Sequence, residues 1–122
     1  MERHTRQRAA LRNVFQSAGR PLSAAEAHRL AVRRVRGIGI ATVYRNIERL
    51  VAGRLLERVD LPGRAPRYEL RRDRHHHHFL CLRCDRVYDI GGCSASLRQG
   101  LRNGFRVDGH EVVLYGTCAA CA

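Results

Sequence analysis

Two pairs of cysteines carry the clearest chemical pattern in the chain. Cys81 and Cys84 form one CxxC pair, and Cys118 and Cys121 form a second pair after 33 intervening residues. One CxxC turn presents two thiolates to a single ion, and two such turns complete a tetrahedral four-cysteine site of the kind that holds structural zinc. The competing interpretation is a redox enzyme with a thioredoxin-like dithiol, which the lack of a βαβ pattern around either pair disfavours.

Four consecutive histidines, residues 75–78, lead into the first cysteine pair and are predicted to enter a strand. Alternation along a strand sends His75 and His77 to one face and His76 and His78 to the other. The two imidazole pairs are therefore expected to belong to two separate metal sites, although a solvated polar run is an alternative.

Further candidate ligands lie near this run, and each has a plainer interpretation. Asp89 could be an ordinary carboxylate at a strand end, and His110 a partly buried histidine. Cys93, the unpaired fifth cysteine, could be a small buried apolar residue. Glu69, which precedes the histidines, is the remaining candidate.

The charge of the chain is concentrated in its N-terminal part. The sequence has 23 basic residues, all of them arginine, and 11 acidic residues, for a formal net charge of +12. Residues 1–74 hold 18 of the arginines and 7 of the acids, whereas all five cysteines follow them. Such a surplus indicates a polyanionic partner. Nucleic acid is favoured over an anionic membrane, because the predicted helices lack exposed large apolar residues that would insert.

The length of 122 residues allows one ordinary domain or two very small ones and excludes large enzyme folds. We expect a boundary near residues 71–74, which gives domains over residues 1–72 and 73–122. No stretch resembles a membrane span or a secretory signal, so a cytoplasmic location is expected. In that compartment the cysteines are more readily explained as metal ligands than as disulfides.

Apolar spacing in the basic part predicts three helices and a hairpin. The first helix covers about residues 5–18, and the second runs from the capping box Ser23-Ala-Ala-Glu26 to about residue 34. A third helix is predicted to begin with Thr42 as its cap. Strands over residues 55–59 and 67–70, joined by a turn rich in proline and glycine, complete a winged helix.

The exposed face of the third helix offers Tyr44, Arg45 and Arg49, with Asn46 toward its edge. Helix–turn–helix proteins place such a helix in the major groove of double-stranded DNA, where arginine can bind guanine through two hydrogen bonds. The alternative is a solvated basic face with no specific partner.

Taken together, these motifs resemble the ferric uptake regulator family of bacterial metal-responsive repressors, most of all its zinc uptake branch. The similarity covers nearly the whole chain in the same order. Its motifs are Thr5-Arg-Gln-Arg8, Gly39-Ile-Ala-Thr-Val-Tyr-Arg45, Arg67-Tyr-Glu-Leu70, the histidine run with its CxxC pair, and Leu114-Tyr-Gly-Thr-Cys118. The resemblance implies an α+β chain with a winged-helix DNA-binding domain followed by a small α/β dimerisation domain. It also implies a homodimer that represses metal-uptake genes at A/T-rich palindromic operators, without an organic substrate or enzymatic activity.

The resemblance also implies roles for individual residues. The four cysteines of the CxxC pairs would hold structural Zn²⁺. A regulatory hinge site would comprise Glu69, His76, His78 and Asp89, and an additional site would include His75, His77 and His110. By the resemblance, Tyr44 and Arg45 would contact bases in the major groove, and Arg6 or Arg8 would lie near the DNA backbone or minor groove. Together with Thr42, Asn46 and Arg49 of the third helix, these residues are our predicted DNA contacts.

The chain departs from the family pattern at two sites. Pro21 stands where many members supply a hinge histidine, and Ser96 stands where the additional site normally has a glutamate. Cys93 is our candidate to replace that glutamate, and a thiolate with three imidazoles favours zinc over ferrous iron as the effector. An Fe²⁺- or Mn²⁺-dependent peroxide sensor or iron-uptake repressor is the alternative within the family, and a purely architectural DNA-binding protein is the alternative outside it.

Overall fold

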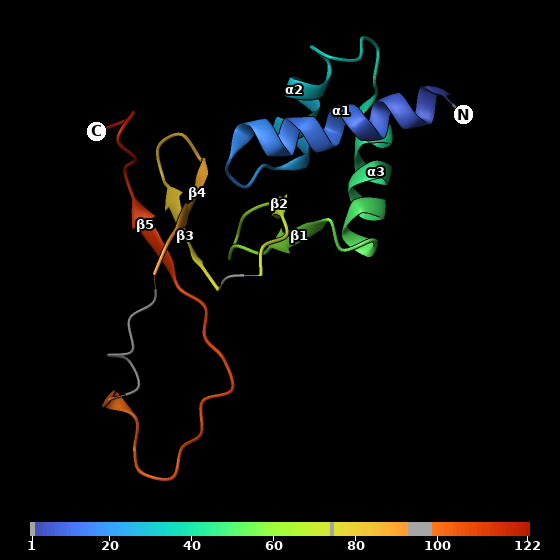
Figure 1. The fold of residues 1–122 in the computed structure, drawn as a ribbon. Helices are drawn as coiled ribbons and strands as arrows, with labels where there is room; N and C mark the ends of the chain where they lie inside the picture. The colour runs from blue at the N-terminus through green and yellow to red at the C-terminus, as the bar shows by residue number, and fades with distance from the viewer. Residues whose placement is uncertain (1, 74, 93–98) are drawn as a thin grey trace. The chain divides into compact units, whose positions relative to one another are not determined.

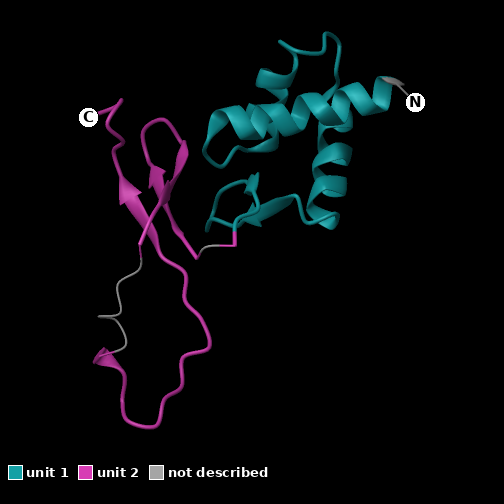
Figure 2. Ribbon diagram, in the orientation of Figure 1, with its two compact units in different colours: residues 1–72 teal, residues 73–122 magenta. Residues whose placement is uncertain are grey.

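The computed structural model describes residues 2–73, 75–92 and 99–122 (Figure 1). The chain forms two compact units, Met1–Arg72 and Asp73–Ala122, which are coloured separately in Figure 2. None of the helices in these described ranges is both long and apolar enough to cross a bilayer. Each unit has its own secondary structure and is considered separately below.

Three helices build the first unit: α1 (Glu2–Ala18), α2 (Ala24–Ala31) and α3 (Ile40–Ala52). Each contributes an apolar stripe at helical spacing to one common core. Leu11 of α1, Ala27 of α2 and Val43 of α3 are all fully buried in it. The amphipathic pattern therefore determines which face of each helix turns inward and which is left for solvent or a partner.

The ends of the helices differ in part from the sequence expectation. The capping box is confirmed, because Ser23 Oγ accepts from the Glu26 amide and Glu26 Oε1 accepts from the Ser23 amide. Thr42 as the cap of the third helix was wrong. Gly39 takes the extended N-cap conformation and its carbonyl accepts from the amide of Val43, so the helix begins at Ile40. The second helix also ends earlier than expected, at Ala31, and tight turns follow it.

A short hairpin follows α3, formed by the antiparallel strands β1 (Leu56–Val59) and β2 (Arg67–Leu70). The outer side of β2 is joined by Leu22, whose amide and carbonyl both pair with Tyr68 at 2.8 Å. This bridge ties the segment between α1 and α2 to the hairpin. The three helices and this wing make the first unit a winged helix.

An ion-pair network lies between α2 and β2 in the interior of the first unit. Glu26 forms an ion pair with Arg20 at 2.9 Å and lies 3.8 Å from the guanidinium of Arg67. The side chain of Arg67 is only 2% exposed, so its charge depends on protein groups rather than on water. Glu26 thus supports both the start of α2 and the buried charge of β2.

The second unit is built on a three-stranded sheet in the order β4-β3-β5. Its strands are β3 (His77–Cys81), β4 (Val87–Ile90) and β5 (Val113–Gly116). Strand β3 pairs antiparallel with β4 and parallel with β5. Among the described residues of this unit, only Leu80, Cys81, Val87, Cys118 and His77 are buried. A core of this size contributes little stability, so an additional cross-link such as a metal site is expected.

Candidate metal centres and DNA-facing helix

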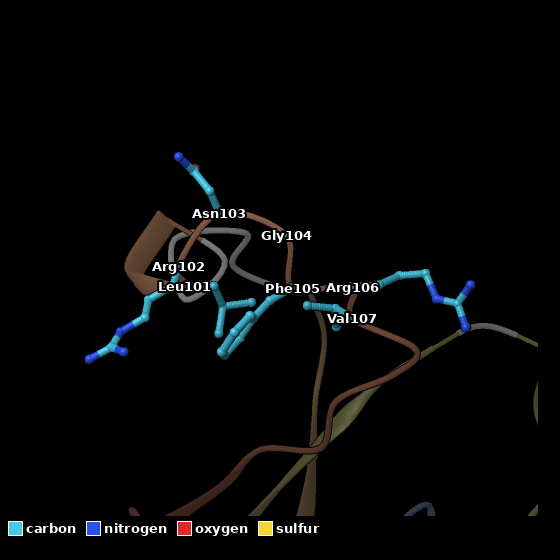
Figure 3. Close-up of a pocket in the computed structure, with 7 residues that line it drawn as sticks. All are labelled: Leu101, Arg102, Asn103, Gly104, Phe105, Arg106 and Val107. Atoms are coloured by element: carbon cyan, nitrogen blue, oxygen red, sulfur yellow. The ribbon is translucent and has the colours of Figure 1, made fainter.

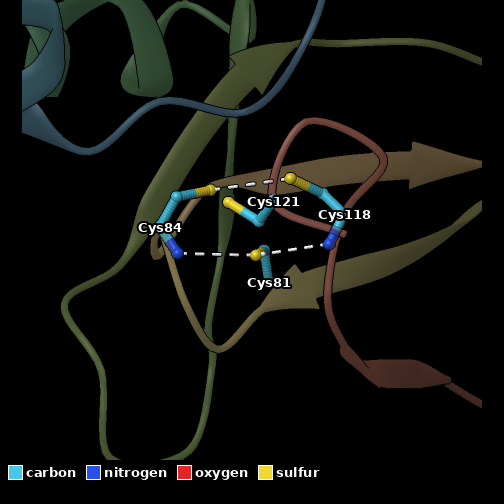
Figure 4. Close-up of side chains that lie close together, drawn as sticks. All are labelled: Cys81, Cys84, Cys118 and Cys121. Atoms are coloured by element: carbon cyan, nitrogen blue, oxygen red, sulfur yellow. Dashed lines mark hydrogen bonds between the residues drawn. The ribbon is translucent and has the colours of Figure 1, made fainter.

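The four cysteines of the two CxxC pairs converge at one end of the sheet (Figure 4). Cys81 is the last residue of β3 and Cys84 lies in the turn that leads to β4, whereas Cys118 and Cys121 follow β5. Parallel pairing of β3 with β5 brings the two turns to the same end of the sheet. Their sulfur atoms all lie within 4.8 Å of one another.

The sulfur spacing matches a tetrahedral metal site and not a disulfide. Sγ of Cys84 and Sγ of Cys118 are 3.8 Å apart. Four sulfurs at about 2.3 Å from a central zinc ion would be separated by about 3.8 Å, whereas a disulfide needs about 2.05 Å. The donor set and its spacing therefore fit zinc, and we refer to these four residues as the cysteine cluster.

Hydrogen bonds within the cysteine cluster prepare one thiolate. The amides of Cys118 and Cys84 donate to Sγ of Cys81 at 3.3 and 3.4 Å. These bonds lower the pKa of Cys81 to about 6. By contrast, the hydrogen bond with Cys118 and then burial raise the pKa of Cys121 to about 12. At neutral pH the metal-free cluster thus offers a charged ligand at Cys81, and binding of zinc would release the proton of Cys121.

A second cluster consists of His75, His77 and His110, which we call the three-histidine cluster. Nε2 of His75 lies 3.1 Å from Nε2 of His77 and 3.3 Å from Nε2 of His110. Nitrogen ligands about 2.05 Å from a tetrahedral ion lie about 3.3 Å apart, so three ring nitrogens already converge as a metal site requires. The predicted grouping of His75 with His77 is thus found in the structure, although β3 begins only at His77.

One hydrogen bond must change before His77 can bind a cation through Nε2. The amide of Val112 donates to Nδ1 of His77 at 3.1 Å. A neutral ring that accepts at Nδ1 carries its proton on Nε2, where a metal would need a lone pair. Metal binding by His77 thus requires its Nδ1–Val112 bond to break or its ring to turn.

Acid is expected to release a cation from the three-histidine cluster. Burial and the neighbouring imidazole of His75 both lower the pKa of His77 from the ordinary value of 6.5. This ring therefore stays neutral at neutral pH, and protons compete with metal for it only in more acidic solution. With zinc in the cysteine cluster, we expect the affinity of the three-histidine cluster for Co²⁺ to fall as the pH drops from about 7.5 to about 5.5, because protons then compete with the cation for imidazole nitrogen.

The visible absorption of Co²⁺ measures this binding. His77→Gln should lose the part of the signal that comes from the three-histidine cluster and bind one equivalent of Co²⁺ fewer than the wild type, whereas His4→Gln, a change on the exposed part of α1, should retain the wild-type pH profile. Equal Co²⁺ affinity at about pH 7.5 and about pH 5.5 would contradict the assignment of imidazole ligands.

A third group joins His76 and His78 with Asp89 on the opposite face of the histidine run. Oδ1 of Asp89 lies 3.3 Å from Nε2 of His78 and 3.7 Å from Nε2 of His76. His78 and Asp89 are direct cross-strand partners between β3 and β4, which explains their approach. Glu69, the fourth predicted ligand of this site, lies on β2 of the first unit, where it is buried. Cys93 and Ser96 lie outside the described residues, so the predicted substitution of a glutamate by Cys93 stays a prediction.

The outer face of α3 presents the side chains expected to contact DNA. Tyr44 is 48% exposed, and Arg45 and Arg49 are exposed as well. Although Thr42 does not cap the helix, its Oγ1 accepts a hydrogen bond from Arg45 Nη2 at 3.1 Å. This bond holds the guanidinium of Arg45 next to Thr42 in the first turn of α3.

Asn46 does not belong to that face. Only 4% of it is exposed, and its amide Nδ2 donates to the carbonyl of Thr42 at 2.9 Å. Asn46 thus packs against the interior of the first unit, and we remove it from the predicted DNA contacts. The positions of Val43 and Ile47 on either side of it explain why helical spacing alone could not place it.

On α1, the predicted contact residues Arg6 and Arg8 are both exposed. Arg12, which the sequence interpretation did not single out, lies one turn after Arg8 on the same helix face. Arg8, Arg12 and Arg49 line one pocket between α1 and the end of α3. The i, i+4 spacing of Arg8 and Arg12 was the signal that could have identified this face.

A hollow in the second unit offers no chemistry of its own. It is lined by the seven consecutive residues of one loop, residues 101–107 (Figure 3). Arg102 and Arg106 extend away from it to different sides, and Leu101 and Phe105 supply its apolar lining. None of its lining side chains is a carboxylate, thiol or imidazole, so it contains no acid–base pair or nucleophile.

Comparisons with known proteins match both units. Residues 2–115 match the model of the Ferric uptake regulator family. A ferric uptake regulation protein of Cupriavidus metallidurans is 34% identical over 109 residues, which cover 86% of this chain and 76% of that protein. One of Klebsiella pneumoniae is 36% identical over 85 residues, 67% of this chain, and the match spans only 55% of that relative's length.

Solved structures with the same fold cover most of the chain. A zinc-bound manganese uptake regulator superposes with a TM-score of 0.80 at 26% identity, covering 92% of this chain and 87% of that one. A zinc uptake regulator from M. tuberculosis gives a TM-score of 0.55 at 28% identity, covering 98% of this chain and 95% of that one.

Proposed function

Because the chain belongs to the ferric uptake regulator family, we propose that it is a metal-responsive, DNA-binding transcriptional repressor rather than an enzyme. It would act in the cytoplasm as a homodimer on palindromic, A/T-rich operators of metal-uptake genes. The observation that carries this proposal is the convergence of metal ligands into separate clusters in a chain whose winged helix exposes arginines on α3. A metal-responsive regulator needs both a site that binds the metal and a surface that binds DNA.

The proposed DNA contacts follow from exposure and charge. Tyr44 and Arg45 would reach base edges in the major groove, where arginine binds guanine and an aromatic ring can touch the thymine methyl group. Thr42 would position Arg45 through the hydrogen bond at 3.1 Å. Arg49, together with Arg6 and Arg8 of α1, would bind phosphates, which makes the affinity fall steeply as salt rises.

The ligand clusters suggest different tasks for the bound metals. The cysteine cluster would hold structural zinc, because a site closed by four thiolates leaves no position for a reacting group. His76, His78 and Asp89 would form the regulatory site together with Glu69. Glu69 precedes the boundary between the units in the sequence and the other three follow it. A cation that is bound more tightly in one arrangement of the two units would shift the population toward that arrangement.

Zinc is our proposed effector, with Fe²⁺ or Mn²⁺ as the alternative. Imidazole nitrogen is a good ligand for Zn²⁺. The three-histidine cluster, with Cys93 as a proposed fourth ligand, would therefore bind Zn²⁺ better than it would bind a cation that prefers oxygen ligands. The names of the relatives refer to iron, manganese and zinc, so they do not separate these metals. Titration of DNA binding with each free cation distinguishes them.

Replacing Arg45 with alanine is expected to weaken binding to the operator by about 1–3 kcal/mol, or about 5- to 150-fold. The change removes the guanidinium held by Thr42 from the exposed face of α3. Fluorescence anisotropy on duplexes selected from a random pool by the zinc-loaded protein measures this loss.

Arg33→Ala is the matched control, because it also removes one exposed positive charge, from the turns between α2 and α3 rather than from α3 itself. It should change the affinity less than Arg45→Ala and leave the preferred sequence unaltered. Equal losses for the two variants would mean that α3 contributes charge alone and does not read bases.

A further inference from the structure

A pocket of about 330 Å³ lies in the first unit, between α1 and the end of α3. Cavities of at least about 300 Å³ are typical of small-molecule sites. Four of its lining residues come from one face of α1 at the spacing i, i+3, i+4 and i+7. The lining comprises Thr5, Arg8, Ala9, Arg12, Arg49, Leu50 and Leu55.

The pocket combines a basic rim with an apolar floor. Arg8, Arg12 and Arg49 provide three positive charges, and no acidic residue of the described chain lines it. Leu50 belongs to the buried core, whereas Leu55 leaves 44% of its surface exposed beside it. Such a lining suits a ligand that has an anionic group at one end and an apolar body at the other.

The three guanidinium groups have no carboxylate partner within the described residues, whereas other arginines, such as Arg20 and Arg58, form ion pairs. The carbonyl end of α3, which lies near the pocket, carries a partial negative charge of about half a unit. Its last carbonyls already accept backbone bonds, such as those from Gly53 to Arg49 and from Leu55 to Leu50 at 2.9 Å. Three full positive charges therefore dominate the field at this rim.

From this combination we infer that the pocket binds a small organic anion, a carboxylate or sulfonate with an aromatic or aliphatic body. A bare DNA phosphate would use the arginines but not the apolar floor, which is why the amphiphilic ligand fits better. Such a ligand would compete with DNA, since Arg8 and Arg49 are also proposed phosphate contacts. That second consequence rests on the proposed function, whereas binding of the anion itself does not.

Naphthalene-2-sulfonate is the probe that tests the pocket. With the zinc-loaded full chain, calorimetry should give a dissociation constant on the order of 0.1–1 mM. Inorganic sulfate and the uncharged analogue naphthalen-2-ylmethanol should each bind at least about tenfold more weakly. Amide chemical shifts should move at Ala9, Leu50 and Leu55.

Two variants localise the effect. Arg12→Gln should weaken binding of the sulfonate about tenfold, because a hydrogen-bonded charge is lost, and Arg33→Gln should leave it unchanged. Circular dichroism verifies that both variants are folded. The inference is overturned if inorganic sulfate binds as tightly as the sulfonate, if the uncharged analogue does, or if Arg12→Gln binds like the wild type.

Competition with a selected DNA duplex tests the second consequence. Naphthalene-2-sulfonate at a concentration near its dissociation constant for the wild type should weaken DNA binding of the wild type more than that of Arg12→Gln. If the sulfonate bound without any effect on DNA binding, competition between the two ligands would be rejected, whereas the pocket would still be a site for the anion. A protein that binds the sulfonate but no duplex at all would instead reject the proposed function.

Discussion

Replacing Cys81 with serine is expected to abolish zinc binding by the cysteine cluster and to unfold the second unit. Structural zinc contributes about 10–16 kcal/mol of apparent binding free energy in small domains, far more than the few buried side chains of this unit can replace. Cys81 is buried and accepts two amide hydrogen bonds, so serine would also disturb the turn around it. We expect a loss of more than about 5 kcal/mol, and thermal unfolding with zinc analysis by mass spectrometry measures it.

The matched control is Ala119→Ser, which introduces the same hydroxyl at an exposed position inside the second CxxC pair. It should retain one equivalent of structural zinc and the wild-type unfolding temperature. A strong chelator added to the wild type should reproduce the effect of Cys81→Ser. If Cys81→Ser unfolded like the wild type and held as much zinc, the cysteine cluster would not be a structural metal site.

Replacing Glu26 with glutamine is expected to lower the free energy of unfolding of the first unit by about 2–3 kcal/mol. Glutamine can still complete the capping box, so the variant removes chiefly the negative charge. The buried guanidinium of Arg67 and the half-buried guanidinium of Arg20 would both lose their ion pair with Glu26. Urea denaturation followed by circular dichroism measures the change.

Glu48→Gln provides the comparison, because this glutamate is exposed on α3. It should alter the unfolding free energy by less than about 0.5 kcal/mol. Equal effects of the two substitutions would show that net charge, rather than the network around Glu26, determines the stability. A loss for Glu26→Gln that is abolished when Arg67 is also replaced by methionine would further support the pair.

Short-range patterns explain why much of this molecule could be anticipated. The winged helix follows from apolar spacing, capping residues and a hairpin whose strands are only a few residues from their turn. The grouping of His75 with His77, and of His76 with His78, could be anticipated from alternation along an extended chain, although β3 itself begins only at His77. The cysteine cluster likewise follows from two CxxC turns, which the parallel pairing of β3 with β5 brings to one end of the sheet.

Features that depend on packing could not be anticipated in the same way. Asn46 is polar, and its residue type alone predicts exposure. It is buried because its side chain is directed toward the carbonyl of Thr42, to which it donates a hydrogen bond. The start of α3 at Ile40 depends on the extended backbone of Gly39, which accepts a helical hydrogen bond without a side-chain cap. The pocket beside Arg12 arises because α1 lies next to the end of α3, a tertiary relationship that no local pattern contains.

Metal-dependent DNA binding tests the central claim most directly. Duplexes selected from a random pool by the zinc-loaded protein can be titrated at defined free concentrations of Zn²⁺, Fe²⁺, Mn²⁺ and Ni²⁺, with the cysteine cluster kept loaded. The proposed function predicts that free zinc raises the affinity at least about tenfold, and that His78→Ala, in the His76–His78–Asp89 group, removes this increase. If iron or manganese raised the DNA affinity and zinc did not, the assignment as a metal-dependent repressor would stand, but zinc would be rejected as its effector. DNA affinity independent of every metal would contradict the account.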